Sequence, residues 1–383
     1  MNACDMNLIT SSVALPLALI TLALFIAPAI AVDVYFGTGG NNAGQPAGVY
    51  VAEFDDAAGK LSRAKLALEL KGAGWVTKHP NLDVLYSTAQ VGEEHAVTAL
   101  DIAGAKAKEI NVQATGGGGS CFITTDHTGK LLISTQYSGG GVSVFPIAED
   151  GSLKSRSQLI KHGEPSRVHK HQKSAHPHYC GISPDNRFAF VCDLGMDKIV
   201  VYEIDHEEAQ LKEVSQASAV AGGGPRHMKF HPRGKFALVL NELTLSVSVF
   251  RYDADSGTLT MVGTTEALSS QEKALNTFNS ASEIRIHPSG KFVYTGNRGY
   301  DSISVFQFDE ATGELQRTGL MHTRGAWPRN FNLSPDGEYL LAAGKDTNSV
   351  AVFNVDQQTG ALQYRQHSSV FVPGPICVMF DRE

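Results

Sequence analysis

Residues 224–250 read GPRHMKFHPRGKFALVLNELTLSVSVF, and this stretch contains the unit from which most of the chain is built. An apolar strand leads into the turn at 231–234, a second apolar strand follows, and a polar loop then leads to a third strand at 246–250. Proline presets φ and glycine tolerates a positive φ, so Pro-x-Gly favours a tight hairpin. The flanking Val, Leu and Phe residues are typical of β-strands. The stretch therefore predicts three consecutive antiparallel strands.

The same unit recurs with a turn-to-turn spacing of roughly 47 to 57 residues, which suits four short strands per unit. Turns of this type stand at 183–186, 231–234, 287–290 and 334–337, and weaker copies begin at residues 79 and 127. The matching third strands stand at 199–202, 247–250, 303–306 and 350–353. Many units continue through a second turn, rich in Asp and Gly, into a further strand. After residue 31 no stretch shows a sustained helical periodicity.

These units amount to six complete copies, together with an N-terminal piece at 32–70 and a C-terminal strand at 375–380. The C-terminal strand matches the first strand of the other units, which the N-terminal piece lacks. Pairing the two pieces completes a seventh unit and closes a ring, whereas an open β-solenoid would not explain the split unit. The prediction is an all-β fold: a seven-bladed β-propeller with four antiparallel strands per blade, closed by the C-terminal strand.

A long apolar run at 13–30 precedes the first predicted strand and ends in the small-x-small sequence Ala29-Ile30-Ala31. This pattern is typical of a secretory signal. It predicts a signal peptide over 1–31, a propeller domain over 32–383, and export to the periplasm or the cell exterior, without stable membrane association after cleavage. The segment before the run has no Lys or Arg and contains Asp5. That departure leaves open a membrane anchor, or a cytoplasmic protein with a mis-called start codon.

Composition limits the classes to which the protein can belong. Hydrophobic residues make up 42% of the 383 positions and charged residues 19%, so a sizeable core is available and disorder is disfavoured. The formal net charge of −7 argues against nucleic-acid binding, which needs a basic surface. Cys180 and Cys192 flank a predicted hairpin, so a disulfide and unpaired thiols are both open. The Cys, His and carboxylate spacings do not suggest zinc or calcium, and no cofactor is expected.

Several charged residues fall at the same end of the predicted hairpins. Residues equidistant from a hairpin turn face each other, which places Arg226 beside Glu242 and His178 beside Asp193. Arg298 ends the second strand of its own blade. All of these positions lie opposite the tight turns, on the two innermost strands. They predict a charged cluster at one mouth of the central channel, where propeller loops are free to vary.

Further polar residues enter or leave the same strands. Arg329 is expected opposite Ala343 at this mouth. The other candidates for substrate binding are His176, His227, Asn241 and Asn297. Three histidines precede the tight turns on the other face and are expected to be structural: His79, His231 and His287. Three more lie in a polar loop and are expected to be solvated: His162, His169 and His171.

At these residues the chain resembles the lactonase family of seven-bladed propellers, which includes 6-phosphogluconolactonases and muconate lactonizing enzymes. The motifs that carry the resemblance are 176–178 with 193–195, 224–232 with 241–242, 294–298 with 301–303, and 328–331. They occur in this order, one per blade, over nearly the whole predicted domain. The resemblance implies catalytic roles for His178, Arg226, Glu242 and Arg298, and a substrate contact for Arg329. The chain departs from the family at 343–345, where Ala-Gly-Lys replaces an Asn-Gln pair of many members.

The resemblance implies hydrolysis of a sugar lactone, as in 6-phosphogluconolactonases, with a lactone or an anionic sugar acid as the small-molecule partner. Water attacking the carbonyl would need a base, either Glu242 or His178, while Arg226 and Arg298 would hold the oxyanion or an anionic group. No Gly-x-Ser-x-Gly motif indicates a serine esterase. A muconate cycloisomerase using the same pocket, and a propeller that serves only as an interaction scaffold, remain alternatives. The sequence does not predict the oligomeric state.

Overall fold

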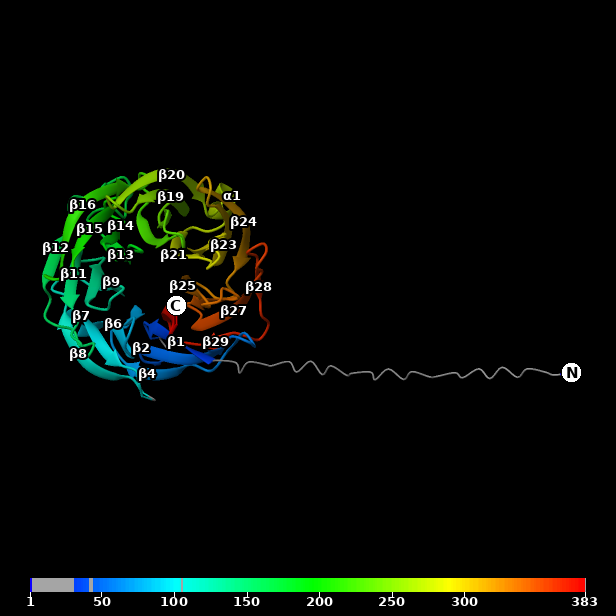
Figure 1. Ribbon diagram of the computed structural model, residues 1–383, viewed down its shortest axis with the longest axis horizontal. Coiled ribbons are helices and arrows are strands. Elements are labelled where there is room, and N and C mark those ends of the chain that lie inside the picture. The colour runs from blue at the N-terminus through cyan, green and yellow to red at the C-terminus, as the bar shows by residue number, and fades with distance from the viewer. Residues whose placement is uncertain (2–30, 41–43, 105, 383) are drawn as a thin grey trace.

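The computed structural model describes residues 1, 31–40, 44–104 and 106–382. These residues form seven antiparallel sheets arranged as blades in a closed ring (Figure 1). Each blade has four strand positions from the centre to the rim, and in two blades the outermost position is divided between two short strands. The predicted all-β fold, a seven-bladed propeller, is therefore confirmed.

We number the blades from the one that joins the two ends of the domain. Blade 1 contains β30 (Pro375–Phe380), β1 (Ala31–Thr38), β2 (Gly48–Asp55), β3 (Lys60–Leu61) and β4 (Lys65–Glu69). Blade 2 contains β5 (Val76–Lys78), β6 (Val84–Val91), β7 (Glu94–Asp101) and β8 (Lys108–Ala114). Blade 3 contains β9 (Ser120–Thr125), β10 (Leu131–Gln136), β11 (Gly141–Pro146) and β12 (Gln158–Lys161). Blade 4 contains β13 (Pro177–Ile182), β14 (Phe188–Asp193), β15 (Lys198–Asp205) and β16 (Gln210–Ser218).

The remaining blades follow the same plan. Blade 5 contains β17 (Pro225–Phe230), β18 (Phe236–Asn241), β19 (Ser246–Asp253) and β20 (Thr258–Glu266). A short helix, α1 (Ser270–Ala274), leads into blade 6, which contains β21 (Ser280–Ile286), β22 (Phe292–Arg298), β23 (Ser302–Asp309) and β24 (Glu314–His322). Blade 7 contains β25 (Pro328–Leu333), β26 (Tyr339–Gly344), β27 (Ser349–Val355), β28 (Leu362–Tyr364) and β29 (Val370–Phe371).

The C-terminal strand closes the ring as predicted. β30 pairs antiparallel with β1, with Phe380 opposite Val34 and Cys377 opposite Gly37, and it occupies the innermost position of blade 1. Val34 is completely buried and Phe380 is 1% exposed. The two ends of the domain thus form one sheet, so that the inner strand of every blade contributes to the central channel.

Histidines at the tight turns link neighbouring blades, in agreement with their expected structural role. Nε2 of His231 donates to the carbonyl of Gly290, in the turn of the next blade, at 3.1 Å. His79 and His287 make the same contact with Gly129 and Gly337 at 3.0 and 3.1 Å. Gly290 has φ +76°, and a Cβ there would lie 2.4 Å from Nε2 of His231. The turn therefore needs glycine for both its conformation and this contact.

The four cysteines within the described residues are all free thiols. In the hairpin of β13 and β14, Cys180 lies opposite Val191 and Cys192 lies opposite Tyr179. Of the two possibilities left open by the sequence, the structure therefore shows unpaired thiols and not a disulfide.

The predicted signal peptide lies almost wholly outside the described residues, so the boundary at residue 31 and export stay predictions. No helix within the described ranges is long and apolar enough to cross a membrane.

Candidate active site

Three blades carry the same irregularity where the innermost strand begins. The register of β13 against β14 shifts between Pro177 and Tyr179, so that His178 is an extra residue without a partner across the ladder. Arg226 holds this place in blade 5 and Arg329 holds it in blade 7. A bulge of this kind re-aims a side chain. Three of the candidate residues are therefore presented at one mouth of the channel by the same backbone feature.

The predicted cross-strand pairing of His178 with Asp193 is wrong, because the bulge places Pro177 opposite Asp193. Oδ1 of Asp193 instead accepts hydrogen bonds from the backbone N–H of His176, just before β13, and from the backbone N–H groups of Gly195 and Met196 in the turn after β14. Its Oδ2 lies 2.7 Å from Nδ1 of His162, whose Nε2 lies 3.0 Å from the hydroxyl of Tyr202. The side chain of His162 is 1% exposed, so the expectation that it is solvated is also wrong.

Glu242 lies between two of the candidate arginines. Its Oε2 is 2.8 Å from Nε of Arg226, and its Oε1 is 3.0 Å from Nη2 of Arg298. Burial alone would raise the pKa of Glu242, but Arg298 and Arg226 more than offset this and hold the pKa below its usual range. Burial and the nearby Arg298 lower the pKa of Arg226 to about 9, so Arg226 is still protonated at neutral pH. Glu242 is thus a carboxylate that anchors two guanidinium groups.

Arg329 makes neither a hydrogen bond nor an ion pair with another residue in the part of the chain that the structure describes. Burial and the nearby charge of Arg298 lower its pKa. The mouth therefore holds three guanidinium groups, those of Arg226, Arg298 and Arg329. Glu242 is in contact with the first two of them. The charge of Glu242 acts on Arg329 without forming an ion pair with it. A half-buried guanidinium without a direct ion pair is costly, and a bound carboxylate or phosphate would satisfy it.

His178 is 4% exposed, and its Nδ1 is buried without a hydrogen-bond partner among the described residues. Its ring lies 5.5 Å from that of Tyr137 and 5.2 Å from that of His227, measured between centroids. Burial, Arg226 and His227 together lower the pKa of His178 well below the ordinary value. The imidazole is therefore neutral at physiological pH and can accept a proton or a hydrogen bond.

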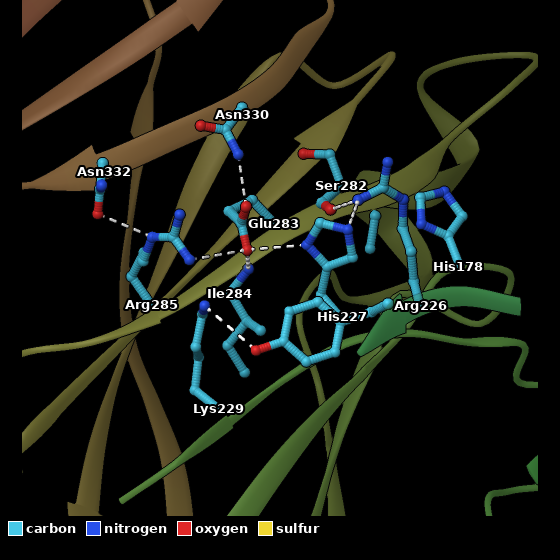
Figure 2. A network of polar contacts seen from close by, with 12 residues as sticks. His178, Arg226, His227, Lys229, Ser282, Glu283, Ile284, Arg285, Asn330 and Asn332 are labelled. Atoms are coloured by element: carbon cyan, nitrogen blue, oxygen red, sulfur yellow. Dashed lines mark hydrogen bonds and ion pairs between the residues drawn. The ribbon is translucent and has the colours of Figure 1, made fainter. Parts of the chain in front are cut away.

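Beneath this layer lies a second, fully buried one (Figure 2). Nη1 of Arg226 lies 3.0 Å from Nε2 of His227, and Nδ1 of His227 lies 3.0 Å from Oε1 of Glu283. His227 is 1% exposed and Glu283 is completely buried. Figure 2 shows the imidazole of His227 between the carboxylate of Glu283 and the guanidinium of Arg226. This burial gives no support to the prediction that His227 binds substrate directly.

The other predicted binding residues fall into two groups. His176 lies beside the site, where its ring stacks on Tyr137 at 4.3 Å and its Nδ1 donates to the carbonyl of Tyr137 at 2.8 Å. Asn241 and Asn297 are completely buried. Each donates from Nδ2 to two serine hydroxyls of the third strand in its own blade, at 2.9 to 3.1 Å. These contacts brace the blades, and the prediction that the two asparagines bind substrate gains no support from them.

Sequence reasoning missed three residues near the site: Tyr137, Glu283 and Trp327. Tyr137 packs on the two histidines of blade 4, and Cζ of Arg298 lies 5.7 Å from the ring centroid of Trp327. Only Glu283 had a usable signal, because it is an acidic residue within the innermost strand of its blade, β21, and a buried charge requires partners. The two aromatic residues lie in connecting loops, where no sequence periodicity indicates orientation.

A cavity of about 700 Å³ lies at the opposite mouth of the channel. It is lined by the C-terminal ends of inner strands, including Ile182 and Phe230, whereas the candidate residues stand at the N-terminal ends. Lys78 in its wall is paired with Asp381 at 2.7 Å. We place the candidate site at the arginine-lined mouth, since the unpaired guanidinium and imidazole groups are there.

Comparison with known proteins extends over the whole domain. The family model described as "Lactonase, 7-bladed beta-propeller" matches residues 33–380. A 6-phosphogluconolactonase of Bacillus subtilis (strain 168) is 32% identical over 286 residues, which cover 74% of this chain and 80% of the relative. A crystal structure from Lactobacillus plantarum superimposes with a TM-score of 0.84 at 29% identity, covering 92% of this chain and 99% of the other. A periplasmic gluconolactonase of Pseudomonas aeruginosa gives 0.83 at 27% identity with the same coverage.

Proposed function

The chain belongs to the family of seven-bladed β-propeller lactonases, and we propose that it hydrolyses a sugar lactone bearing an anionic group. The observation that carries the proposal is the cluster at the arginine-lined mouth. There, one carboxylate holds Arg226 and Arg298, Arg329 has no protein partner, and His178 is neutral with a free nitrogen. The names of the B. subtilis and P. aeruginosa relatives support a gluconate-type lactone.

In the proposed mechanism, water attacks the lactone carbonyl while His178 accepts its proton. The oxyanion that forms is stabilised by the guanidinium groups of Arg226 and Arg298, whose positive charges are already in place before the reaction. When the tetrahedral intermediate collapses, the bond from the acyl carbon to the ring oxygen breaks. His178 then returns the proton to the departing oxygen, which becomes the hydroxyl of the product acid.

Of the two candidate bases, the geometry favours His178. Both carboxylate oxygens of Glu242 face a guanidinium within 3.0 Å, so neither is free to take a proton from water. We therefore assign Glu242 to anchoring the arginines. Nδ1 of His178 has no competing partner in the described part of the chain.

The wild-type protein should hydrolyse 6-phosphogluconolactone and glucono-δ-lactone faster than the spontaneous reaction, measured as acid release with a pH indicator. Ring closure of a muconate, assayed beside it, should be much slower. Faster muconate turnover would overturn hydrolysis in favour of the cycloisomerase alternative, and no turnover of any of these compounds would remove the lactonase proposal for this substrate class.

Arg329→Ala should raise KM for 6-phosphogluconolactone about 10- to 100-fold, the scale of one charge-assisted hydrogen bond, and should change KM for neutral glucono-δ-lactone little. The reason is that the guanidinium of Arg329 makes no hydrogen bond or ion pair within the described residues and is available to the phosphate. Arg324→Ala is the matched control, because Arg324 is an exposed arginine in the segment that leads into β25, where it lies over the ring of Tyr364. Equal effects on both lactones would contradict a phosphate contact.

The acid limb of kcat/KM should lie well below pH 6.5, the ordinary pKa of histidine. His178 must be neutral to accept a proton, and its lowered pKa keeps it neutral down to lower pH than a solvated histidine. Activity should therefore be nearly constant from about pH 8 down to about pH 6.5 and fall only on further acidification. An acid limb centred near pH 7, absent in His178→Gln, would contradict a buried neutral histidine as the base.

A further inference from the structure

The buried pair of Glu283 and His227 makes its hydrogen-bond contact with the proposed site through Arg226, and the ring of His227 also packs edge-on against that of His178 at 5.2 Å. Both residues are buried. We infer that Glu283 and His227 are positioning residues that hold the guanidinium of Arg226 in the orientation required for hydrolysis. This inference rests on the proposed function of the arginine-lined mouth.

The hydrogen-bond pattern allows one tautomer of His227. A protonated guanidinium can only donate, so Nε2 of His227 must accept from Nη1 of Arg226 and cannot carry a proton. The proton of the neutral ring is then on Nδ1, which donates to Oε1 of Glu283. Burial lowers the pKa of His227 to about 3, although Glu283 opposes the shift, which agrees with a neutral ring. Glu283 thus determines which nitrogen faces Arg226.

Glu283 itself is held in place as a carboxylate. Its oxygens accept from the backbone N–H of Ile284 at 2.9 Å, from Nη1 of Arg285 at 3.4 Å and from Nδ2 of Asn330. The amide of Asn330 cannot rotate freely, because its Oδ1 accepts from the backbone N–H of Val378 at 2.9 Å. Four donors therefore surround Glu283, and a protonated or amide side chain would place a donor against a donor.

Aromatic rings hold His227 from the sides. Trp75, Phe122 and Tyr179 lie 5.2 to 5.5 Å from it, measured between ring centroids. Arg226 is held at three points: His227, the carbonyl of Ser282 and Glu242. Nε of Arg226 faces Glu242 as an ion pair without a hydrogen bond, and Nη1 contacts His227 and Ser282. Nη2 makes neither kind of contact among the described residues and is left for substrate. Such preorganisation matters because a misplacement of about 1 Å can cost a hundredfold in rate.

The test compares three replacements of His227. His227→Phe keeps a flat ring but removes both nitrogens, and it should lower kcat about 10- to 100-fold with KM changed less than about threefold. His227→Asn places its amide near the position of Nδ1 only, and its kcat should be as low as that of His227→Phe. His227→Gln places an amide oxygen near Nε2, accepts from Arg226, and should recover most of kcat. Glu283→Gln should resemble His227→Phe, because its amide favours the other tautomer.

A purely structural role must be separated from positioning. Tyr294→Phe is a stability control, because the buried hydroxyl of Tyr294 donates to the carbonyl of Gly360 at 2.9 Å, away from the site. It should lower the melting temperature and leave kcat unchanged. An unchanged kcat in folded His227→Phe, or a loss in His227→Gln equal to that in His227→Phe, would overturn the inference while lactone hydrolysis stands.

An NMR measurement that needs no catalytic turnover tests the inference even if the protein does not hydrolyse lactones. In 15N-labelled protein the Nε–H resonance of Arg226, identified by its absence in Arg226→Lys, should be sharp and protected from exchange with water. It should broaden or disappear in His227→Phe and persist in His227→Gln. Identical spectra for these two variants would overturn the inference even if the wild-type protein hydrolyses no lactone.

Discussion

Arg226→Ala should lower kcat for lactone hydrolysis at least about a hundredfold, the usual cost of removing a donor that stabilises an oxyanion. The guanidinium of Arg226 contacts Glu242 and His227, and alanine would remove the positive charge and leave Oε2 of Glu242 and Nε2 of His227 without their partner. Arg226→Lys should recover only part of the rate, because an ammonium group cannot reproduce the planar set of contacts. Initial rates of acid release, corrected for spontaneous hydrolysis, measure the effect.

Arg233→Ala provides the matched control for this prediction. Arg233 lies at the tight turn of the same blade, its side chain is 69% exposed, and it pairs with Glu310 on the opposite face of the ring. Its removal should change neither kcat nor KM beyond about twofold, as is usual for an exposed ion pair. Near-normal turnover of Arg226→Ala would exclude Arg226 as an essential group and would remove the proposed role of the mouth.

The fold could be predicted because its cause is repeated along the chain. Each copy of the apolar strand and tight turn indicates the same hairpin, so an ambiguity in one copy is resolved by the others. Ring closure was predictable as well, since the C-terminal strand Pro375–Phe380 supplies the position that the N-terminal piece lacks. The short helix Ser270–Ala274 was not expected, because five residues are too few to show a helical period.

The site could be predicted only in part, because its geometry depends on irregularities that the repeat conceals. Counting outward from a turn assumes an unbroken ladder, and the bulge at His178 breaks it, so Asp193 pairs with other groups. The same bulge at Arg329 places Asn330, and not Arg329, opposite Ala343.

The predicted proximity of Arg226 and Glu242 is confirmed, because both residues lie at the open end of one hairpin. Contacts between blades, such as Glu283 with His227, join residues 56 positions apart and leave no local pattern.

Glu242→Gln should have the other large effect, on stability as well as on rate. Glu242 is the counter-charge of Arg226 and Arg298, whose side chains are 3% and 6% exposed. An amide of the same shape can accept from one guanidinium but opposes the other with its own N–H groups. Breaking a buried ion pair on one side commonly costs about 3 to 5 kcal/mol in the free energy of unfolding, because the remaining charge is left uncompensated. Urea denaturation followed by tryptophan fluorescence measures this loss.

The rate should fall at least about a hundredfold in the same variant, since the two arginines repel each other and leave their positions around the oxyanion. The double variant Glu242→Gln/Arg298→Met separates the two effects. Removing the second charge should restore part of the stability, because a whole ion pair can often be replaced by apolar groups at little cost. It should not restore kcat, because an oxyanion-stabilising group is then missing. Unfolding midpoints and turnover that both stay close to wild type in Glu242→Gln would contradict the assignment of Glu242 as the anchor of the site.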